Sequence, residues 1–185
     1  MRDGLPDAVR LRFDLPAKKP GAYQVRIAVR DMTSARIGSA GQFVVVPDLK
    51  DKGLPLSGIV LRNIRQTSTP TAVMATPSAR RFVANSELYF GMMAYNTSSN
   101  PAAQLPDLMM ETKLFRDGKI IGPASQTAID IKNQSDPSRL FINGVFRLTP
   151  DLEPGNYFLQ VAITDKASRE KQPSSTQWVD FEIVK

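Results

Sequence analysis

The sequence contains neither cysteine nor histidine among its 185 residues. Without cysteine, the chain cannot form disulfides, thiolate nucleophiles, zinc ribbons or iron–sulfur sites. Without histidine, it lacks the commonest general base and the commonest metal ligand, which excludes Ser-His-Asp and Cys-His catalysis. Catalysis would have to use carboxylate, lysine or tyrosine side chains. We therefore expect a protein that is not an enzyme and that binds no metal or cofactor.

Long hydrophobic runs are also missing. No run of about 18 apolar residues occurs, so the sequence predicts no transmembrane helix. The first residues, MRDGLPDAVRLRF, lack the apolar stretch that a signal peptide requires. A hydrophobic fraction of 42% and a charged fraction of 23% are typical of a globular protein, and the length suits one or two domains.

Helical periodicity is scarce, whereas apolar and polar residues often alternate with a period of two, which is typical of half-buried β-strands. Val25, Ile27 and Val29, for example, alternate with polar or basic residues. The pair Asp117-Gly118 is the strongest hairpin signal. Together these features predict an all-β chain of the immunoglobulin-like or fibronectin-III-like β-sandwich class. The predicted strands are residues 9–13, 24–30, 43–46, 56–64, 81–83 (a short edge strand), 87–95, 108–115, 119–121, 128–131, 139–148, 157–164 and 178–184.

The sequence also matches itself. Residues 20–31, PGAYQVRIAVRD, align with residues 154–165, PGNYFLQVAITD, with identical Pro, Gly, Tyr, Ala and Asp. In an immunoglobulin-like sandwich, a Tyr near the start of strand F donates its hydroxyl to the backbone of the E–F corner. We therefore expect Tyr23 and Tyr157 to have this structural role, and each repeat to represent strands E, F and G.

The predicted strands divide the chain into a partial unit and a complete one. Residues 56–185 contain enough strands for a complete sandwich, residues 1–47 contain only three, and residues 48–55 form a linker. An isolated sheet of three strands would expose an apolar face and two open edges. We therefore expect a protein partner, or a homo-oligomer formed through residues 1–47, to complete this sheet. The chain is predicted to act as a non-catalytic interaction module.

Residues 19–61, KPGAYQVRIAVRDMTSARIGSAGQFVVVPDLKDKGLPLSGIVL, are similar to the region that follows the von Willebrand factor A-like domain in VWFA-related proteins of Acidobacteria. The resemblance is most specific here and extends to Lys185. It implies β-sandwich modules, a location in the cell envelope or outside the cell, and a role in adhesion or assembly. It does not imply the family's metal site, because the chain has no Asp-x-Ser-x-Ser loop. The nearest string, DMTS at 31–34, occupies the same turn as residues 165–168, so we interpret it as a capped turn.

Three further groups of residues, methionines, basic residues and carboxylates, are candidate functional sites. Neighbouring methionines point to opposite faces of a strand, so two methionine doublets indicate core packing rather than a copper site. The net charge of +6 is carried by scattered basic residues, so we expect no nucleic-acid binding. The dispersed carboxylates leave a carboxylate-based hydrolase as a remote alternative. These groups are Met92, Met93, Met109 and Met110; Arg10, Arg12, Arg26, Arg30, Arg80 and Arg81; and Asp48, Asp51, Asp107, Glu111, Asp130, Asp136 and Asp151.

The only tryptophan lies in the last predicted strand. Val179, Phe181 and Ile183 share the inner face of this strand, which leaves Trp178 on the outer face. An exposed aromatic platform around Trp178 or Tyr89 would favour the alternative function, a carbohydrate-binding β-sandwich module. Residues 65–85 are predicted to form a long loop. The sequence assigns no ligand-binding residue there or elsewhere.

Overall fold

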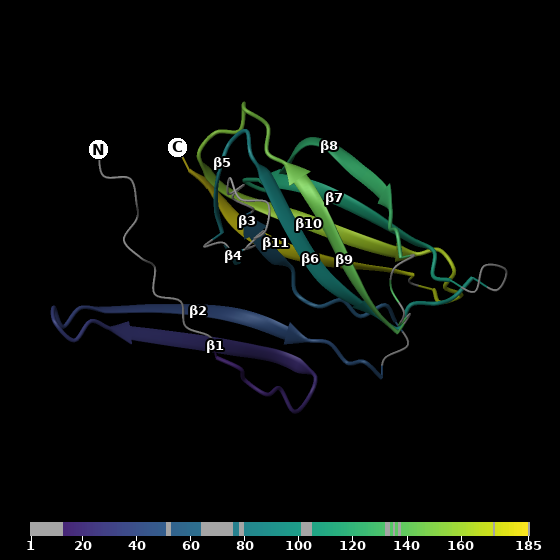
Figure 1. Cartoon of the computed structure of the whole chain (residues 1–185), viewed down its shortest axis with the longest axis horizontal. Coiled ribbons are helices and arrows are strands. Elements are labelled where there is room, and N and C mark those ends of the chain that lie inside the picture. The colour runs from purple at the N-terminus through teal and green to yellow at the C-terminus, as the bar shows by residue number, and fades with distance from the viewer. Residues whose placement is uncertain are drawn as a thin grey trace, which may run out of the picture.

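The computed structural model describes residues 13–50, 53–63, 76–77, 80–100, 105–131, 134, 136, 138–171 and 173–184. In these residues the regular elements are β-strands, arranged in three sheets (Figure 1). The strands are β1 (Gly21–Arg30), β2 (Ile37–Val46), β3 (Val60–Asn63), β4 (Thr76–Pro77), β5 (Arg81–Val83), β6 (Glu87–Tyr95), β7 (Leu108–Arg116), β8 (Lys119–Ala128), β9 (Arg139–Arg147), β10 (Gly155–Asp165) and β11 (Ser174–Val184). The predicted all-β class is confirmed.

Two of the sheets share one apolar core. The five-stranded sheet has the order β5-β11-β10-β7-β8, and the four-stranded sheet has the order β4-β3-β6-β9 (Figure 1). Strand β10 shows why these residues form this layer. Tyr157, Leu159, Val161 and Ile163 are buried, whereas the residues between them are exposed or half-buried. Full burial of one such aliphatic side chain stabilises the fold by about 1.5–3 kcal/mol.

Strand β6 coincides with the predicted strand 87–95 and lies inside its sheet, between β3 and β9. At the centre of β6, a glycine on each of β6 and β9 lies against an aromatic ring of the other strand. A Cβ atom at Gly144 would lie 2.5 Å from Cζ of the buried Phe90, and a Cβ atom at Gly91 would lie 2.8 Å from Cζ of Phe141. Each glycine therefore leaves room for an aromatic ring of the neighbouring strand.

The hairpin predicted at Asp117-Gly118 is confirmed, because these residues connect β7 and β8 and both have positive φ angles, 49° and 75°. The predicted separate strand at 128–131 is wrong. Strand β8 runs from Lys119 to Ala128 through Gly122 and Pro123, where its register with β7 shifts in a bulge. The Gly-Pro pair suggests a break, but β8 is an edge strand, where a residue without an N–H group is tolerated.

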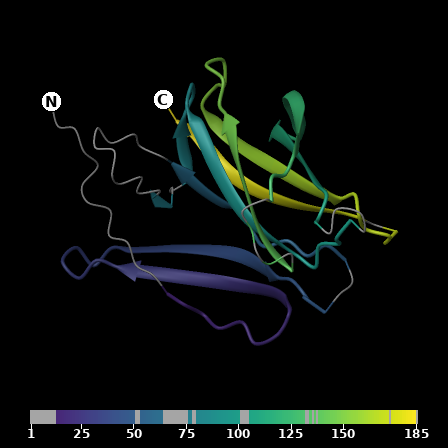
Figure 2. The same ribbon diagram turned by 45° about the vertical axis from the view of Figure 1, so that its right-hand side comes forward.

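Strands β1 and β2 form a separate two-stranded antiparallel sheet, which lies outside the two facing sheets in both views (Figures 1 and 2). Both strands extend beyond the predicted residues 24–30 and 43–46. Of the predicted strand 9–13, only Phe13 is described, and it is not part of a strand. Val9, Leu11 and their neighbours lie outside the described residues.

The connection between the hairpin and the facing sheets is described except at residues 51 and 52. Asn96, at the end of β6, donates a side-chain hydrogen bond of 2.9 Å to the carbonyl of Leu49. Within the predicted loop 65–85, the described residues include β4 and the predicted edge strand β5, which pairs in parallel with β11; the remainder lies outside the described part. Among the described residues, no helix is long and apolar enough to cross a membrane.

Candidate interaction surface

The two sequence repeats have the same local structure. The Tyr157 hydroxyl donates a hydrogen bond of 2.8 Å to the carbonyl of Glu153, and the Tyr23 hydroxyl donates one of 2.6 Å to the carbonyl of Lys19. The glycine two residues before each tyrosine has a positive φ, 146° in the second repeat and 139° in the first, a conformation that strongly favours glycine. The predicted structural role of both tyrosines is therefore confirmed.

The turns that follow the two repeats also match. Asp31 accepts a hydrogen bond of 2.8 Å from the backbone N–H of Thr33, and Asp165 accepts one of 3.0 Å from the N–H of Ala167. The hydroxyl of Ser34, followed by the backbone N–H groups of Thr33 and Ser34, holds the pKa of the Asp31 carboxyl below its ordinary value. These contacts confirm a capped turn at residues 31–34, which uses the carboxylate oxygens internally.

The repeats differ in what covers their apolar faces. In β10 the exposed fractions are 1% for Tyr157, 0% for Val161 and 0% for Ile163. Their counterparts in β1 are 37% exposed at Tyr23, 48% at Ile27 and 58% at Val29. We call this side of the hairpin the Tyr23 face. It consists of Tyr23, Val25, Ile27 and Val29 of β1 and their cross-strand neighbours Ala40, Gln42 and Val44 of β2.

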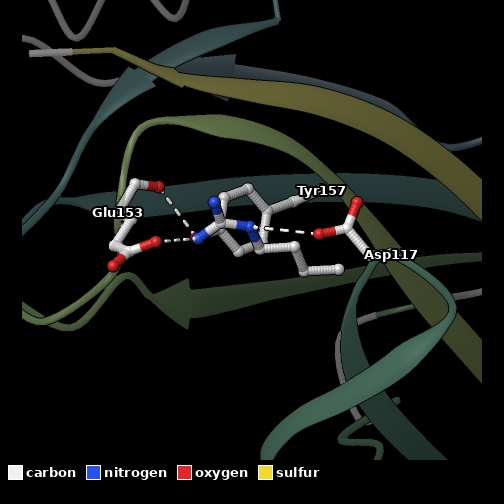
Figure 3. A network of polar contacts seen from close by, with 4 residues as sticks. Asp117, Glu153 and Tyr157 are labelled. Carbon is white, nitrogen blue, oxygen red and sulfur yellow. Dashed lines mark hydrogen bonds and ion pairs between the residues drawn. The ribbon is translucent and has the colours of Figure 1, made fainter.

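Strand β7 supplies part of the covering in the second repeat. It pairs antiparallel with β10 and contributes Arg116, whose guanidinium lies over the Tyr157 ring, 5.5 Å from its centroid (Figure 3). Arg116 also contacts Glu153 at 2.8 Å and Asp117 at 3.6 Å, and it donates a bond of 3.2 Å to the Tyr157 hydroxyl. The Glu153 carboxylate, followed by Tyr157, raises the pKa of Arg116. Arg116 thus joins the β7–β8 turn to the corner before β10.

In the first repeat, by contrast, β1 pairs with β2 alone among the described strands. The other edge of β1 therefore has a row of backbone groups without a strand partner among the described strands, and the large apolar residues of the Tyr23 face remain partly exposed. Such an edge and such a face are typical sites of strand addition and apolar docking. The sequence predicts an incomplete unit at residues 1–47, and the structure adds which edge of the hairpin has no described strand partner.

The free edge of β2 faces the larger sheet. A hollow of about 480 Å³ lies between β2 and β11 and is lined by Gly41, Gln42, Phe43, Val44, Val45, Gly58, Ile59, Arg80, Gln177, Trp178, Val179 and Asp180. The run FVVV at 43–46 gives β2 apolar residues on both faces. Phe43 and Val45, on the side opposite the Tyr23 face, are 71% and 63% exposed.

A second exposed surface is aromatic. Trp178 lies on the outer face of β11, as predicted, and is 50% exposed, while Val179, Phe181 and Ile183 are buried. Its ring centroid is 5.0 Å from that of Phe115 on β7. Phe115, Phe158, Trp178 and Gly118 line a hollow of about 450 Å³. We call the three rings the Trp178 platform.

Tyr89 is separate from this platform, since it lies on β6 in the other sheet. Its hydroxyl donates a hydrogen bond of 2.7 Å to Glu87. This bond is the main reason that the pKa of Glu87 is lowered and that of Tyr89 is raised. Tyr89 is therefore engaged in a local pair with Glu87.

The remaining predicted groups have structural roles or stay apart. Met92 and Met110 are buried in the core while Met93 and Met109 are half-buried, which confirms core packing. The basic pair at 80–81 forms ion pairs with Asp180 and Glu182 of β11. Arg10, Arg12 and Asp51 lie outside the described residues.

The carboxylates remain dispersed, except for two. Asp107 and Asp130 line one hollow of about 520 Å³ together with Asn100. Glu111 lies on β7, where the amine of Lys113, 2.7 Å away, lowers the pKa of its carboxyl. Asp136 and Asp151 accept bonds from Ser138 and Thr149, and these bonds lower the pKa of each carboxyl. Within the described residues, no three acidic side chains gather closely enough to hold a metal ion.

No protein-family model and no curated protein matches this chain. Among solved structures, the chain is similar to a family 123 glycoside hydrolase from Clostridium perfringens, with 12% identity and a TM-score of 0.39 over 56% of this chain and 22% of that chain. It is also similar to a protein from Bacteroides vulgatus ATCC 8482 named "Putative bacterial DNA binding protein", with 14% identity and a TM-score of 0.29 over 91% of this chain and 71% of that chain. Likenesses at this level assign no function to the chain.

Proposed function

We propose that this chain is a non-catalytic structural and protein-interaction module in which another polypeptide covers the Tyr23 face. One observation carries the proposal: the same structural unit occurs twice, with its apolar face buried in one copy and exposed in the other. Ile27 is 48% exposed, whereas its counterpart Val161 is fully buried. Large exposed apolar patches on soluble proteins commonly mark interaction sites.

The strand order supports an immunoglobulin-like interpretation of this unit. Strands β6 and β9 pair as B and E do, and β8, β7, β10 and β11 are adjacent in the order C′, C, F and G. On this assignment β1 and β2 correspond to F and G of a further sandwich. The similarity of residues 19–61 to VWFA-related proteins supports a role in adhesion or assembly, in the cell envelope or outside the cell.

Light scattering coupled to size exclusion tests the form of this interaction that the sequence predicts, a homo-oligomer through residues 1–47. We expect a dimer of twice 20.4 kDa that dissociates when Ile27→Asp places a charge on the Tyr23 face. The matched control is Ala28→Asp, which places the same charge on the opposite face of β1 and should leave the dimer intact. A dimer that survives Ile27→Asp contradicts the proposed surface. A monomer excludes self-association and directs the search to a different protein partner.

The Trp178 platform favours a second candidate function, carbohydrate binding. Sugars stack on exposed aromatic rings, and Trp178 and Phe158 are 50% and 47% exposed. We expect a soluble glycan that binds here to quench the fluorescence of Trp178, the only tryptophan. Trp178→Ala should then abolish binding on a glycan array, while Ile27→Asp should retain it. Equal glycan binding by wild type and Trp178→Ala would contradict a site at the platform.

A further inference from the structure

Strand β7 shows how the second repeat completes the edge of its first strand, β10. The two strands run antiparallel, with Leu114 opposite Leu159, Thr112 opposite Val161 and Met110 opposite Ile163. The β7 residues at these positions are buried, and those between them are half-buried. In the strand that pairs with this edge, buried and half-buried residues therefore alternate, and each buried residue lies opposite a buried residue of β10.

The same geometry transfers to β1, because the two repeats share their corner hydrogen bond, their glycine conformation and their final turn. A strand that added to β1 in the register of β7 would place inward side chains opposite Val25, Ile27 and Val29. A hollow of about 400 Å³ lies over the paired residues of both strands and is lined by Arg26, Ile27, Ala28, Ser39, Ala40 and Gly41.

The charges on β1 determine the outward residues of such a strand. Arg26 and Arg30 are exposed on the face of β1 opposite the Tyr23 face. Arg26 donates a hydrogen bond of 2.8 Å to the side chain of Gln24, and neither arginine forms an ion pair with another described residue. They take the places of Gln160 and Thr164, whose neighbours on β7 are Lys113 and Met109. A cation opposite either arginine would be unfavourable, whereas a carboxylate would be favourable, because opposite charges stabilise a cross-strand pair.

The same charges disfavour a second copy at this edge. If β1 paired antiparallel with β1 of another chain, with the apolar faces aligned, two copies of Arg26 and two of Arg30 would lie together on one face. Like charges directly or diagonally opposite each other destabilise strand pairing. Edge addition at β1 is therefore better suited to a different strand.

We propose that β1 accepts an antiparallel partner strand in which apolar residues alternate with acidic ones, the acidic residues lying opposite Arg26 and Arg30. This inference rests on the proposed function, since it specifies what binds at the hairpin. Backbone hydrogen bonds along the edge supply affinity, the inward residues extend the Tyr23 face, and the carboxylates select the partner and its register.

Two peptides derived from β7 test the proposal on the full chain. The acidic peptide, LEMETELFR, carries Met109→Glu and Lys113→Glu, and the basic peptide, LKMETKLFR, carries lysine at both places. Since each cross-strand charge pair changes affinity several-fold, we expect the acidic peptide to bind about tenfold more tightly in fluorescence anisotropy. The difference should shrink as salt is added. The double variant Arg26→Glu/Arg30→Glu should reverse the preference.

Two controls separate edge addition from nonspecific adhesion. An acidic peptide with N-methylated backbone amides retains its side chains but cannot form the ladder, so it should not bind. Hydrogen–deuterium exchange of the complex should show new protection in β1 and little change in β2.

Equal affinity of the two peptides, binding by the N-methylated peptide, or no binding at all overturns the proposed edge partner. If both peptides bind equally and Ile27→Asp abolishes both complexes, the Tyr23 face is an interaction surface without charge selection. The proposed function then stands while this inference fails. If Ile27→Asp changes neither peptide binding nor oligomeric state, the proposed function fails as well.

Discussion

The Tyr157 hydroxyl illustrates how one side chain can stabilise a corner between strands. It donates to the Glu153 carbonyl and accepts a bond from Arg116, and its ring is almost fully buried. Among the described residues, the Tyr23 hydroxyl makes only the equivalent backbone bond, on an exposed ring. Two chemically identical hydrogen bonds thus lie in different surroundings within one chain, and their energetic contributions should differ.

We predict that Tyr157→Phe lowers the free energy of unfolding by about 1–2 kcal/mol, because it leaves a backbone carbonyl and a guanidinium each without one partner. The matched variant Tyr23→Phe should change it by less than about 0.5 kcal/mol, since water replaces the lost bond. Urea unfolding followed by Trp178 fluorescence measures both. Equal losses for the two variants would mean that the hairpin is buried against something in solution.

We predict that the hydrogen bonds to Asp31 make the stability of the hairpin depend on pH. The hydroxyl of Ser34 is the largest cause of the lowered pKa of Asp31, so Ser34→Ala should raise this pKa toward its ordinary value. Because the folded pKa lies below the unfolded one, the turn stabilises the hairpin above that unfolded value, and this contribution disappears as pH falls through the folded pKa, below about pH 4. NMR titration of the Asp31 carboxyl is the measurement. Ser168→Ala, in the turn of the second repeat, should leave the Asp31 pKa unchanged.

At the scale of elements, most strands could be predicted from alternation alone. The segment ELYFGMMAY forms β6, and the Asp-Gly pair forms the β7–β8 turn. The prediction at β8 was wrong because a Gly-Pro pair within a strand is tolerated at a sheet edge or a bulge, and both depend on the tertiary structure. The role of Gly144 was likewise invisible in the sequence, because it depends on which ring lies across the sheet.

We predict that Gly144→Ala destabilises the sheet by about 1–3 kcal/mol, since the new methyl group would overlap the buried Phe90 ring and lie 3.2 Å from Cε of Met110. Gly58→Ala is the control, because no heavy atom lies within 4 Å of the added Cβ. Chemical unfolding of both variants decides the matter. A neutral Gly144→Ala variant would show that the Phe90 ring can move aside.

At the scale of the whole molecule, stability should be distributed unevenly. Strands β7, β10 and β11 lie in a shared core, whereas β1 and β2 are bonded only to each other among the described strands. A two-stranded sheet alone is marginally stable in water. We predict that hydrogen–deuterium exchange in β1 and β2 is much faster than in β10 and slows when a partner strand is bound. Equally slow exchange in both parts of the isolated chain would contradict an open Tyr23 face.

The sequence by itself determined the all-β class, most strand positions, the two tyrosine corners and the duplication of one unit. These properties are local, since they depend on side-chain periodicity, turn residues and a hydrogen bond between residues four apart. Only the tertiary structure decided which copy of the repeat is buried, which edge of the hairpin is free and which aromatic rings meet on the outer face. These properties depend on neighbours distant in the chain: β7 pairs with β10, and no described strand pairs with the free edge of β1.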